Sequence, residues 1–494
     1  TDNFKLTFGI RADMPIFLDK PGVDTHFNET TIPMLEAAGW DMMGAQAGQM
    51  PTSQILWSPR IGFNWDVKGD ETTQLRGGVG IFTSRLPLVW PGGSYTNNGL
   101  TIGGVYYKGS DIVFSGDWED QYENTDFGMQ DAVPSGQMDL FTADFKFPQM
   151  FRANLGLDQK LGWGVIGTID GIFTKTINNV NYFNMNVNKE SEYNLTGADT
   201  RPYYSDSKID PTYTRIIVGT NTNEGYAYNF SAMLEKPFNN GFTANLAYSF
   251  GRSMAINDGT SSQNSSQWRY NESVSGLNNL DLTYSDFDQG HRVTTFLSYR
   301  KEYFNHAATQ ISVFYNGASG YRFSYVYNDY GDLNGEGENS GNLLYVPASQ
   351  GDIVFANAET ADAQWAALND YIESDSYLST RRGDYAERNG ARTPFSNMID
   401  LKIAQDFFIK AGSKRHKLQL TLDVFNLGNL LNPDWGRRWY VGNDAFQLVK
   451  FKGFADDGTT PTFEYTEPRS TWSADDSGLR SSRWMAQVGV RYSF

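Results

Sequence analysis

The chain of 494 residues carries a formal net charge of −17, and its mean hydropathy is −0.49 although 15% of its residues are aromatic. No stretch approaches the ~18 uninterrupted apolar residues of a bilayer-spanning helix, which excludes a helical membrane protein but leaves open strands that cross with half of their residues polar. The absence of cysteine excludes disulfides and thiolate sites. The acidic balance argues against a nucleic-acid partner and suits loops that meet cations.

A recurring unit runs along the chain: a strand of about ten residues, a tight turn, a second strand and a long polar loop. The strands predicted in chain order are 3–11, 56–67, 72–85, 151–161, 164–177, 226–236, 241–254, 291–303, 307–327, 397–409, 415–427 and 484–494. The long connections predicted between them are 12–55, 86–150, 178–225, 255–290, 328–396 and 428–483. Short turns at one end and long loops at the other are typical of outer-membrane barrels. We therefore predict an all-β fold, a transmembrane antiparallel β-barrel domain over residues 1–494.

Side chains within these strands alternate between an apolar and a polar face. The last strand alternates from Trp484 to Phe494, and the strand before it sets Leu420 and Leu422 against the polar face that carries Asp423. A charge on the lipid face costs on the order of 2–4 kcal/mol at the bilayer midplane, so a spanning strand has to keep this pattern. A soluble sandwich also has amphipathic strands, but its chain rarely stops on a bare phenylalanine.

About twelve strands are predicted, and their order fixes the orientation of both ends of the sheet. If the short turns are periplasmic, the first strand begins and the last strand ends at the periplasmic side. An even number of strands allows a closed barrel of this size, although the loops are large for it.

One loop segment has helical rather than strand periodicity. Within residues 357–373, Trp365, Leu368 and Ile372 follow helical spacing behind a candidate N-cap, Asn357. We predict a short helix packed on the extracellular loop layer.

A candidate calcium loop is the most concrete chemical motif. Asp332, Asn334 and Glu336 place oxygen ligands at the first, third and fifth positions of a turn that has glycine at the sixth. The twelfth position is Leu343, where an EF-hand needs a carboxylate, so Asp329 or Glu338 would have to complete the site. The alternative is a solvated, glycine-rich acidic loop tip without metal.

The sequence offers no catalytic constellation. The four histidines are widely spaced, and neither a phosphate-binding glycine loop nor a dinucleotide fingerprint is present. We therefore expect no enzyme and no certain cofactor. The histidines are His26, His291, His306 and His416.

Several spaced segments resemble the C-terminal region of TonB-dependent transporters, in particular the Oar-like, carboxypeptidase-regulatory-like group of Bacteroidota. These segments are 286–292 (DFDQGHR), 317–325 (GASGYRFSY), 332–337 (DLNGEG), 344–347 (LYVP), 388–395 (RNGARTPF) and 422–432 (LDVFNLGNLLN). Members of this family are similar to 22-stranded barrels that hold an N-terminal plug. The resemblance implies that these strands are the last twelve of such a barrel, and that the plug and its TonB-contacting box lie outside this sequence.

The resemblance implies an outer-membrane protein of a Gram-negative bacterium that imports a large or scarce nutrient. Its partners would be outer-membrane lipid and lipopolysaccharide, and TonB through the plug. The alternative is a scaffold barrel in a larger outer-membrane assembly, whose loops or walls bind other outer-membrane proteins. The terminal strand also resembles the signal that the barrel-insertion machinery reads, with Tyr492 and Phe494 as its contacts. Phe494 would also anchor the closing strand at the membrane interface.

Overall fold

The computed structural model describes residues 3–102, 115–118, 136–205, 207–328, 332–337, 341–412, 414–476 and 482–494. Twelve long antiparallel strands form the main path of its 15-stranded sheet, and three shorter strands pair beside that path. Each strand pairs with the next along the chain, so the predicted meander of hairpins is confirmed. The strands are β1 (Phe4–Asp13), β2 (Leu56–Asp66), β3 (Thr73–Thr83), β5 (Gln149–Lys160), β6 (Ile166–Asn184), β10 (Tyr226–Asn239), β11 (Phe242–Ala255), β13 (Gly290–Tyr303), β14 (Ala307–Ala318), β19 (Ser396–Ala411), β20 (Lys414–Phe425) and β25 (Met485–Ser493).

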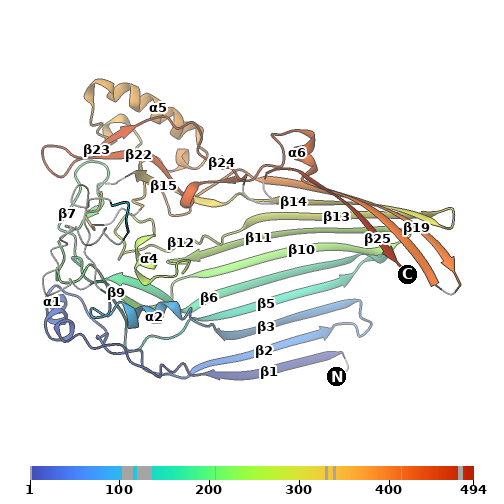
Figure 1. Ribbon diagram of the computed structural model, residues 1–494, viewed down its shortest axis with the longest axis horizontal. Coiled ribbons are helices and arrows are strands. Elements are labelled where there is room, and N and C mark those ends of the chain that lie inside the picture. The colour runs from blue at the N-terminus through green and yellow to red at the C-terminus, as the bar shows by residue number, and fades with distance from the viewer. Residues whose placement is uncertain are drawn as a thin grey trace.

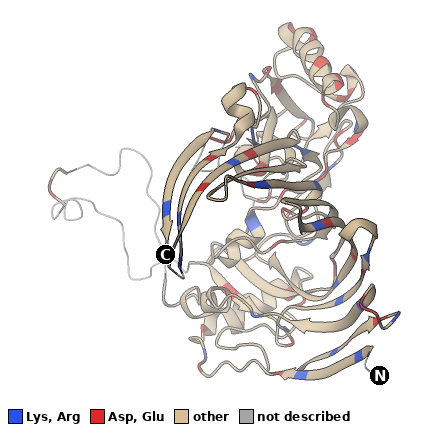
Figure 2. Cartoon of the chain, turned by 90° about the vertical axis from the view of Figure 1, so that its right-hand side faces the viewer, with Lys and Arg blue, Asp and Glu red and all other residues tan. Residues whose placement is uncertain are grey.

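The sheet is curved and open rather than closed. Figure 2 shows the curvature of the sheet, whose edge strands are β1 and β25. Within the described part of the chain, β1 pairs only with β2 and β25 only with β20. The described strands therefore do not close into a twelve-stranded barrel. Both termini lie at the end of the sheet that carries the short turns, as the strand order predicts (Figure 1).

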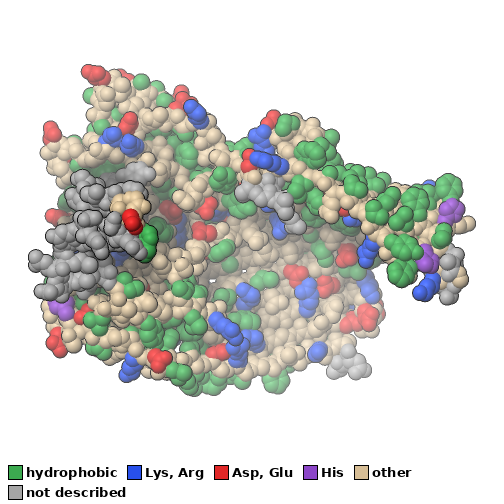
Figure 3. All heavy atoms as spheres, viewed as in Figure 1, with side chains coloured by type: hydrophobic (Ala, Val, Ile, Leu, Met, Phe, Trp, Pro, Cys, Tyr) green, Lys and Arg blue, Asp and Glu red, His purple; other side chains and the backbone are tan. Residues whose placement is uncertain are grey.

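The two faces of the sheet differ in chemistry, as the alternation predicts. Leu246 of β11 lies opposite Leu234 of β10, and both are about half exposed, at 48%. The other face carries ion pairs, among them Arg76 with both Asp158 and Asp170 at 2.8–2.9 Å. Figure 3 shows apolar side chains over the β19, β20 and β25 end and charged side chains on the part of the sheet seen below them. An apolar outer face and a polar inner face suit lipid and an aqueous lumen.

One predicted strand is wrong in its extent. Residues 307–327 were expected to form a single strand, but β14 ends at Ala318 and β15 (Arg322–Asn328) leaves the main sheet for a smaller one. The chain breaks near Gly320, where an added Cβ would lie 1.9 Å from the carbonyl oxygen of Thr393. Residues 323–327 are all buried, so β15 belongs to a packed core and not to a half-exposed wall. The long connection therefore spans 319–395 and not 328–396.

The long connections form a folded layer at one end of the sheet, which we call the loop layer. Its largest hydrophobic core gathers β15, β22, β23 and α5, and two smaller cores lie around α1 and α2 (Figure 1). No helix in the described ranges combines the length and apolar character needed to cross a membrane. The remaining elements are η1 (Phe27–Thr31), α1 (Ile32–Ala37), α2 (Val89–Thr96), β4 (Met138–Phe141), η3 (Gly162–Gly164), β7 (Tyr193–Asn194), β8 (Pro202–Tyr203), β9 (Ile216–Thr222), α4 (Asn264–Arg269), β12 (Thr283–Tyr284), β16 (Tyr345–Val346), η4 (Gln350–Asp352), η5 (Ala358–Thr360), α5 (Ala361–Ser374), η6 (Leu378–Thr380), β17 (Asp384–Tyr385), β18 (Ala391–Arg392), α6 (Leu427–Leu431), β21 (Trp439–Tyr440), η7 (Gly442–Asp444), β22 (Ala445–Phe454), β23 (Pro461–Tyr465) and β24 (Ser473–Ala474).

The predicted loop helix is confirmed as α5. The side chain of Asn357 accepts a 2.9 Å hydrogen bond from the backbone N–H of Glu359, so it caps the short turn that leads into the helix. Leu368 and Ile372 are fully buried, and Trp365 packs beside them on the largest loop-layer core. The helix is therefore held by its apolar stripe, as its spacing predicts.

Candidate ligand-binding cavity in the loop layer

Three of the segments singled out in the sequence meet at the base of the loop layer. Asp288 accepts hydrogen bonds from the guanidinium groups of Arg322, at 2.5 Å, and of Arg392. Nearby, the side-chain amide of Asn389 donates a 2.7 Å hydrogen bond to the carboxylate of Asp286. Because these residues come from segments 286–292, 317–325 and 388–395, the motifs form one polar network, which we call the motif network.

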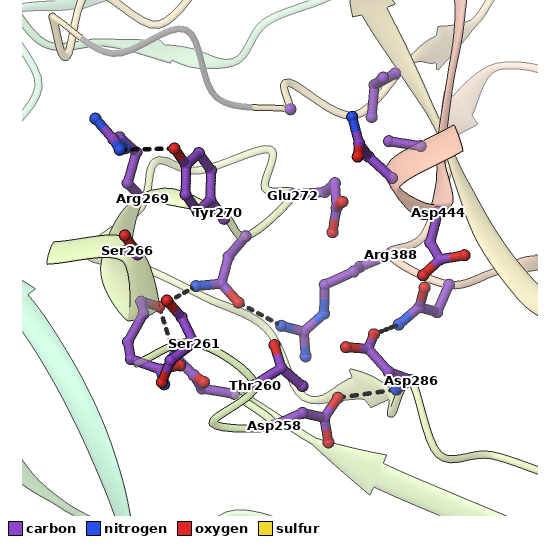
Figure 4. Close-up of a pocket in the computed structure, with 18 of the residues that line it drawn as sticks. Asp258, Thr260, Ser261, Ser266, Arg269, Tyr270, Glu272, Asp286, Arg388 and Asp444 are labelled. Atoms are coloured by element: carbon purple, nitrogen blue, oxygen red, sulfur yellow. Dashed lines mark hydrogen bonds between the residues drawn. The ribbon is translucent and has the colours of Figure 1, made fainter. Parts of the chain in front are cut away.

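A cavity of about 610 Å³ adjoins the motif network. Its walls come from the connection after β11, which includes α4, from the end of β15, and from the start of β22 (Figure 4). Asp286, Arg388 and Asn389 of the motif segments form part of the wall. The other lining residues are Asn257, Asp258, Thr260, Ser261, Ser266, Gln267, Arg269, Tyr270, Asn271, Glu272, Val326, Tyr327, Asn328, Gly341, Asn443, Asp444, Ala445 and Gln447.

Four carboxylates give the cavity an acidic wall. Burial raises the pKa of Glu272 to about 7, against the opposing effect of the Arg388 charge. Burial also raises the pKa of Asp258, although Ser285 Oγ and the backbone N–H of Asp286 donate hydrogen bonds to it at 2.6 and 2.8 Å. The pKa of Asp444 is raised by burial and by the nearby Asp286.

Arg388 is held by uncharged acceptors rather than by these carboxylates. Its guanidinium donates to the carbonyl oxygens of Ala255 and Ile256, and at 3.1 Å to the side-chain oxygen of Asn271. Its Nε atom is buried and has no hydrogen-bond partner in the part of the chain that the structure describes. The cation therefore fixes the connection after β11 to the segment that precedes β18, and it does not neutralise the cavity by direct pairing.

A second cavity, of about 420 Å³, lies against the motif network as well. Asp286 lines both cavities, and Arg292, Arg322 and Arg438 give the second one a basic wall. Its remaining lining includes Tyr321 and Trp439. The motif network thus lies between a cavity with an excess of carboxylates and a cavity in which three arginines outnumber two carboxylates, Asp286 and Asp288.

The candidate calcium residues lie in the loop layer, with their oxygens partly engaged. Glu336 accepts hydrogen bonds from the backbone N–H of Leu277 at 2.9 and 3.1 Å, and the carboxylate of Asp332 accepts one from the N–H of Gly337. The side-chain oxygen of Asn334 is buried and has no hydrogen-bond partner among the described residues. Within the described ranges no three His, Asp or Glu side chains are grouped to hold a metal ion. Asp329 and Glu338, the predicted completing ligands, lie outside the described residues.

The candidate insertion signal lies on the edge strand at the short-turn end. The rings of Tyr492 and Phe494 are stacked with centroids 5.7 Å apart, and Phe494 is 80% exposed. The hydroxyl of Tyr492 makes a 2.6 Å hydrogen bond with His416 Nδ1 on β20. The two aromatic rings are therefore available at the surface of β25.

Sequence reasoning missed the acidic residues of the larger cavity. Asp258, Glu272 and Asp444 come from two loops that are far apart in the chain, and no spacing rule relates them. The sequence signal that could have located the cavity was the pair of family-like segments that contain Asp286 and Arg388, because these two residues line it.

Comparison with known proteins gives a family match over most of the chain. The family model described as "Outer membrane beta barrel domain" matches residues 1–435. No curated protein matches the sequence. Among solved structures, the outer membrane transporter YddB from Escherichia coli has a TM-score of 0.41 and 11% identity, with 89% of this chain and 41% of that one covered.

Two further solved structures are similar to the same degree. The FrpB iron transporter from Neisseria meningitidis (F3-3 variant) has a TM-score of 0.38 and 10% identity, with 99% of this chain and 43% of that one covered. The siderophore receptor PirA from Acinetobacter baumannii has a TM-score of 0.36 and 10% identity, with coverages of 87% and 40%. The chain spans less than half of the length of each of these proteins.

Proposed function

Because the chain belongs to the outer-membrane β-barrel domain family, we propose that it serves the energised uptake of a nutrient too large or too scarce for porins. The protein lies in the outer membrane of a Gram-negative bacterium. The observation that carries the proposal is the cavity of about 610 Å³ in the loop layer, at the end of the sheet opposite the short turns. Loops at that end would capture the ligand, and passage would follow rearrangement of a plug.

The finer assignment within this proposal is an Oar-like, TonB-dependent transporter of the Bacteroidota type, with TonB as its energy-coupling partner. It is supported by the motif network, since the residues that carry the resemblance are in contact. A barrel of 22 strands is part of the same proposal. In lipid, the backbone groups along the outer edges of β1 and β25 need partners, and further strands would supply them.

A scaffold barrel is the competing proposal. The observation in its favour is the loop layer itself, which contains its own β15–β22–β23 sheet and a large hydrophobic core. Such a folded surface also suits stable binding of other outer-membrane proteins. Contacts with outer-membrane lipid and lipopolysaccharide, and with the barrel-insertion machinery, are expected under either proposal.

The test compares nutrient depletion by three cultures of the source bacterium in a complex medium. The cultures are a strain that lacks the gene, the complemented strain, and the complemented strain treated with a protonophore. Mass spectrometry of the medium measures which components each culture removes. Uptake predicts a class of medium components that only the untreated complemented strain removes. Equal depletion by all three cultures, together with purification of the protein at fixed stoichiometry with other outer-membrane proteins, would support the scaffold instead.

A further inference from the structure

Two of the four carboxylates of the larger cavity, those of Glu272 and Asp444, have no partner on another described residue. Glu272 lines the cavity, and among the described residues its carboxylate accepts a hydrogen bond from its own backbone N–H and forms no ion pair. Gly341 leaves room for it, since a Cβ there would lie 2.7 Å from Glu272 Cγ. Figure 4 shows its carboxylate directed into the space between Arg388 and Asp444. A half-buried carboxylate without an ion-pair partner is costly to ionise, and a cation in the cavity would lower that cost.

The nearest positive charge does not provide that partner. Arg388 donates to Ala255, Ile256 and Asn271, and within the described ranges it forms no ion pair. The side chain of Asp444 is exposed at the cavity wall and likewise has no hydrogen-bond partner among the residues that the structure places. The cavity therefore contains two unpaired acids at a common wall, with Asp258 and Asp286 close behind them.

The remaining lining is rich in amide and hydroxyl side chains, and its aliphatic side chains are Val326 and Ala445. Carboxamide side chains can donate and accept at once, so they suit ligands with hydroxyl or amide groups. A volume of about 610 Å³ lies within the roughly 300–1,000 Å³ that is usual for small-molecule sites. The acidic wall would repel an anionic metal chelate and attract an amine or guanidinium. The amide and hydroxyl side chains are those of Asn257, Thr260, Ser261, Ser266, Gln267, Asn271, Asn328, Asn389, Asn443 and Gln447.

We propose that this cavity binds a small ligand in which an amine or guanidinium group is surrounded by hydroxyl or amide groups. The ammonium or guanidinium lies against Glu272 and Asp444, and the amide-rich wall holds the neutral part. The inference rests on the proposed function because it treats the cavity as the site that captures the nutrient for uptake. It differs from that function in naming the ligand chemistry, and binding is measurable without transport.

The experiment is isothermal titration of the purified full-length protein in detergent with two matched pairs of probes. The glucosamine trimer is compared with its fully N-acetylated form, and the capped peptide acetyl-Gly-Arg-Gly-amide is compared with acetyl-Gly-citrulline-Gly-amide. Within each pair the members are similar in size, and only one is cationic. We expect at least one cationic probe to bind roughly tenfold or more tightly than its neutral partner. The variants Glu272→Gln and Asp444→Asn should each remove most of that difference.

The matched control variant is Asp434→Asn, which changes an exposed carboxylate in an ion pair outside the cavity. It should bind like the wild type, and the thermal melting of every variant is measured to show that it is folded. If Glu272→Gln does not fold, Asp444→Asn carries the test. The proposal is overturned if neither cationic probe binds more tightly than its neutral partner, or if both cavity variants keep the full preference.

The outcome separates this inference from the uptake function. Cation-selective binding without gene-dependent depletion of any medium component would sink the uptake proposal and support the ligand chemistry. Gene-dependent depletion of medium components without cation-selective binding would support the uptake proposal and overturn the proposed ligand chemistry.

Discussion

The side-chain amide of Asn389 donates a 2.7 Å hydrogen bond to the carboxylate of Asp286, and this contact joins two segments that are 103 residues apart in the chain. Asp286 precedes β13, and Asn389 lies shortly before β19. Both strands flank β14 in the main sheet. The bond therefore joins two wall residues of the acidic cavity, each of which lies on a segment that leads into a strand of the main sheet.

Asp288 should be a major stabilising residue of the loop layer. It is buried and accepts hydrogen bonds from Arg322 and Arg392, so Asp288→Asn leaves two arginines without their counter-charge. We expect a loss of about 3–5 kcal/mol in the free energy of unfolding. Denaturant titration in lipid vesicles measures it, with Asp434→Asn in an exposed ion pair as the control that should cost less than about 1 kcal/mol. Equal losses in the two variants would contradict the role assigned to the motif network.

Leu246 should face lipid. Its substitution by arginine would place a charge on the apolar face of β11, and we expect a cost of about 2–4 kcal/mol if the site is near the bilayer midplane. The adjacent Asn245 lies on the opposite face, so Asn245→Arg should be tolerated much better. The amount of heat-modifiable, folded protein in outer-membrane fractions reports the difference. The face assignment fails if Asn245→Arg is the more damaging change.

Glu272 should make the stability of the protein fall as the pH rises. Its pKa is raised from an ordinary 4.5 to about 7, so between these values the folded state holds a proton that the unfolded chain releases. The free energy of unfolding should therefore decrease from about pH 4.5 to 7, by on the order of 2–3 kcal/mol, and level off above that. The charged groups that act on Glu272 are Arg388, Asp286 and Asp444.

The measurement is the difference in unfolding free energy between Glu272→Gln and the wild type at pH 5 and at pH 8. Glutamine does not titrate, so the variant should gain stability relative to the wild type as the pH rises. Asp139, whose pKa burial raises to about 6, titrates in both proteins and cancels from the difference. A difference that stays constant with pH would show that Glu272 is ionised throughout.

Phe494 should act in barrel assembly. We expect Phe494→Ala to lower the amount of folded protein in the outer membrane several-fold, because the insertion machinery would lose an exposed terminal ring. Tyr492→Phe keeps a ring and removes only the hydrogen bond to His416, so it should assemble nearly normally. Phe304→Ala, which removes another exposed aromatic at the short-turn end, is the matched control. If it lowers assembly as much as Phe494→Ala, Phe494 is only one interface anchor among several.

Calcium should stabilise the loop that contains Asn334 and Glu336. The buried, unpartnered oxygen of Asn334 would gain a ligand, and calcium at about 100 times its dissociation constant would add roughly 2.7 kcal/mol to the unfolding free energy. Thermal melting with calcium or magnesium, in the wild type and in Asn334→Ala, measures the effect. If the melting temperature does not change with calcium, or if Asn334→Ala keeps the change, the segment is an acidic loop tip without metal.

The twelve strands were predictable because each is defined by local information. The alternation of Leu418, Leu420 and Leu422 with polar residues specifies one strand, and the short turn after β19 specifies its partner. The helix α5 was predictable for the same reason. Residues 307–327 were not, because β15 is buried on both faces and an alternating pattern carries no information about such a strand. The break before it depends on the approach of Thr393 to Gly320, which is a distant contact.

The sequence alone therefore determined the class of the protein: the membrane-suited strands, their order, the end with short turns and the end with long loops. Periodicity and turn chemistry are properties of neighbouring residues, so they can be read without a structure. The tertiary structure alone decided that Glu272, Asp444 and Arg388 share one cavity, and that Asp286 and Asn389 are in contact. These residues lie on separate loops whose relative positions depend on how three hydrophobic cores pack over the end of the sheet, and no local pattern encodes that packing.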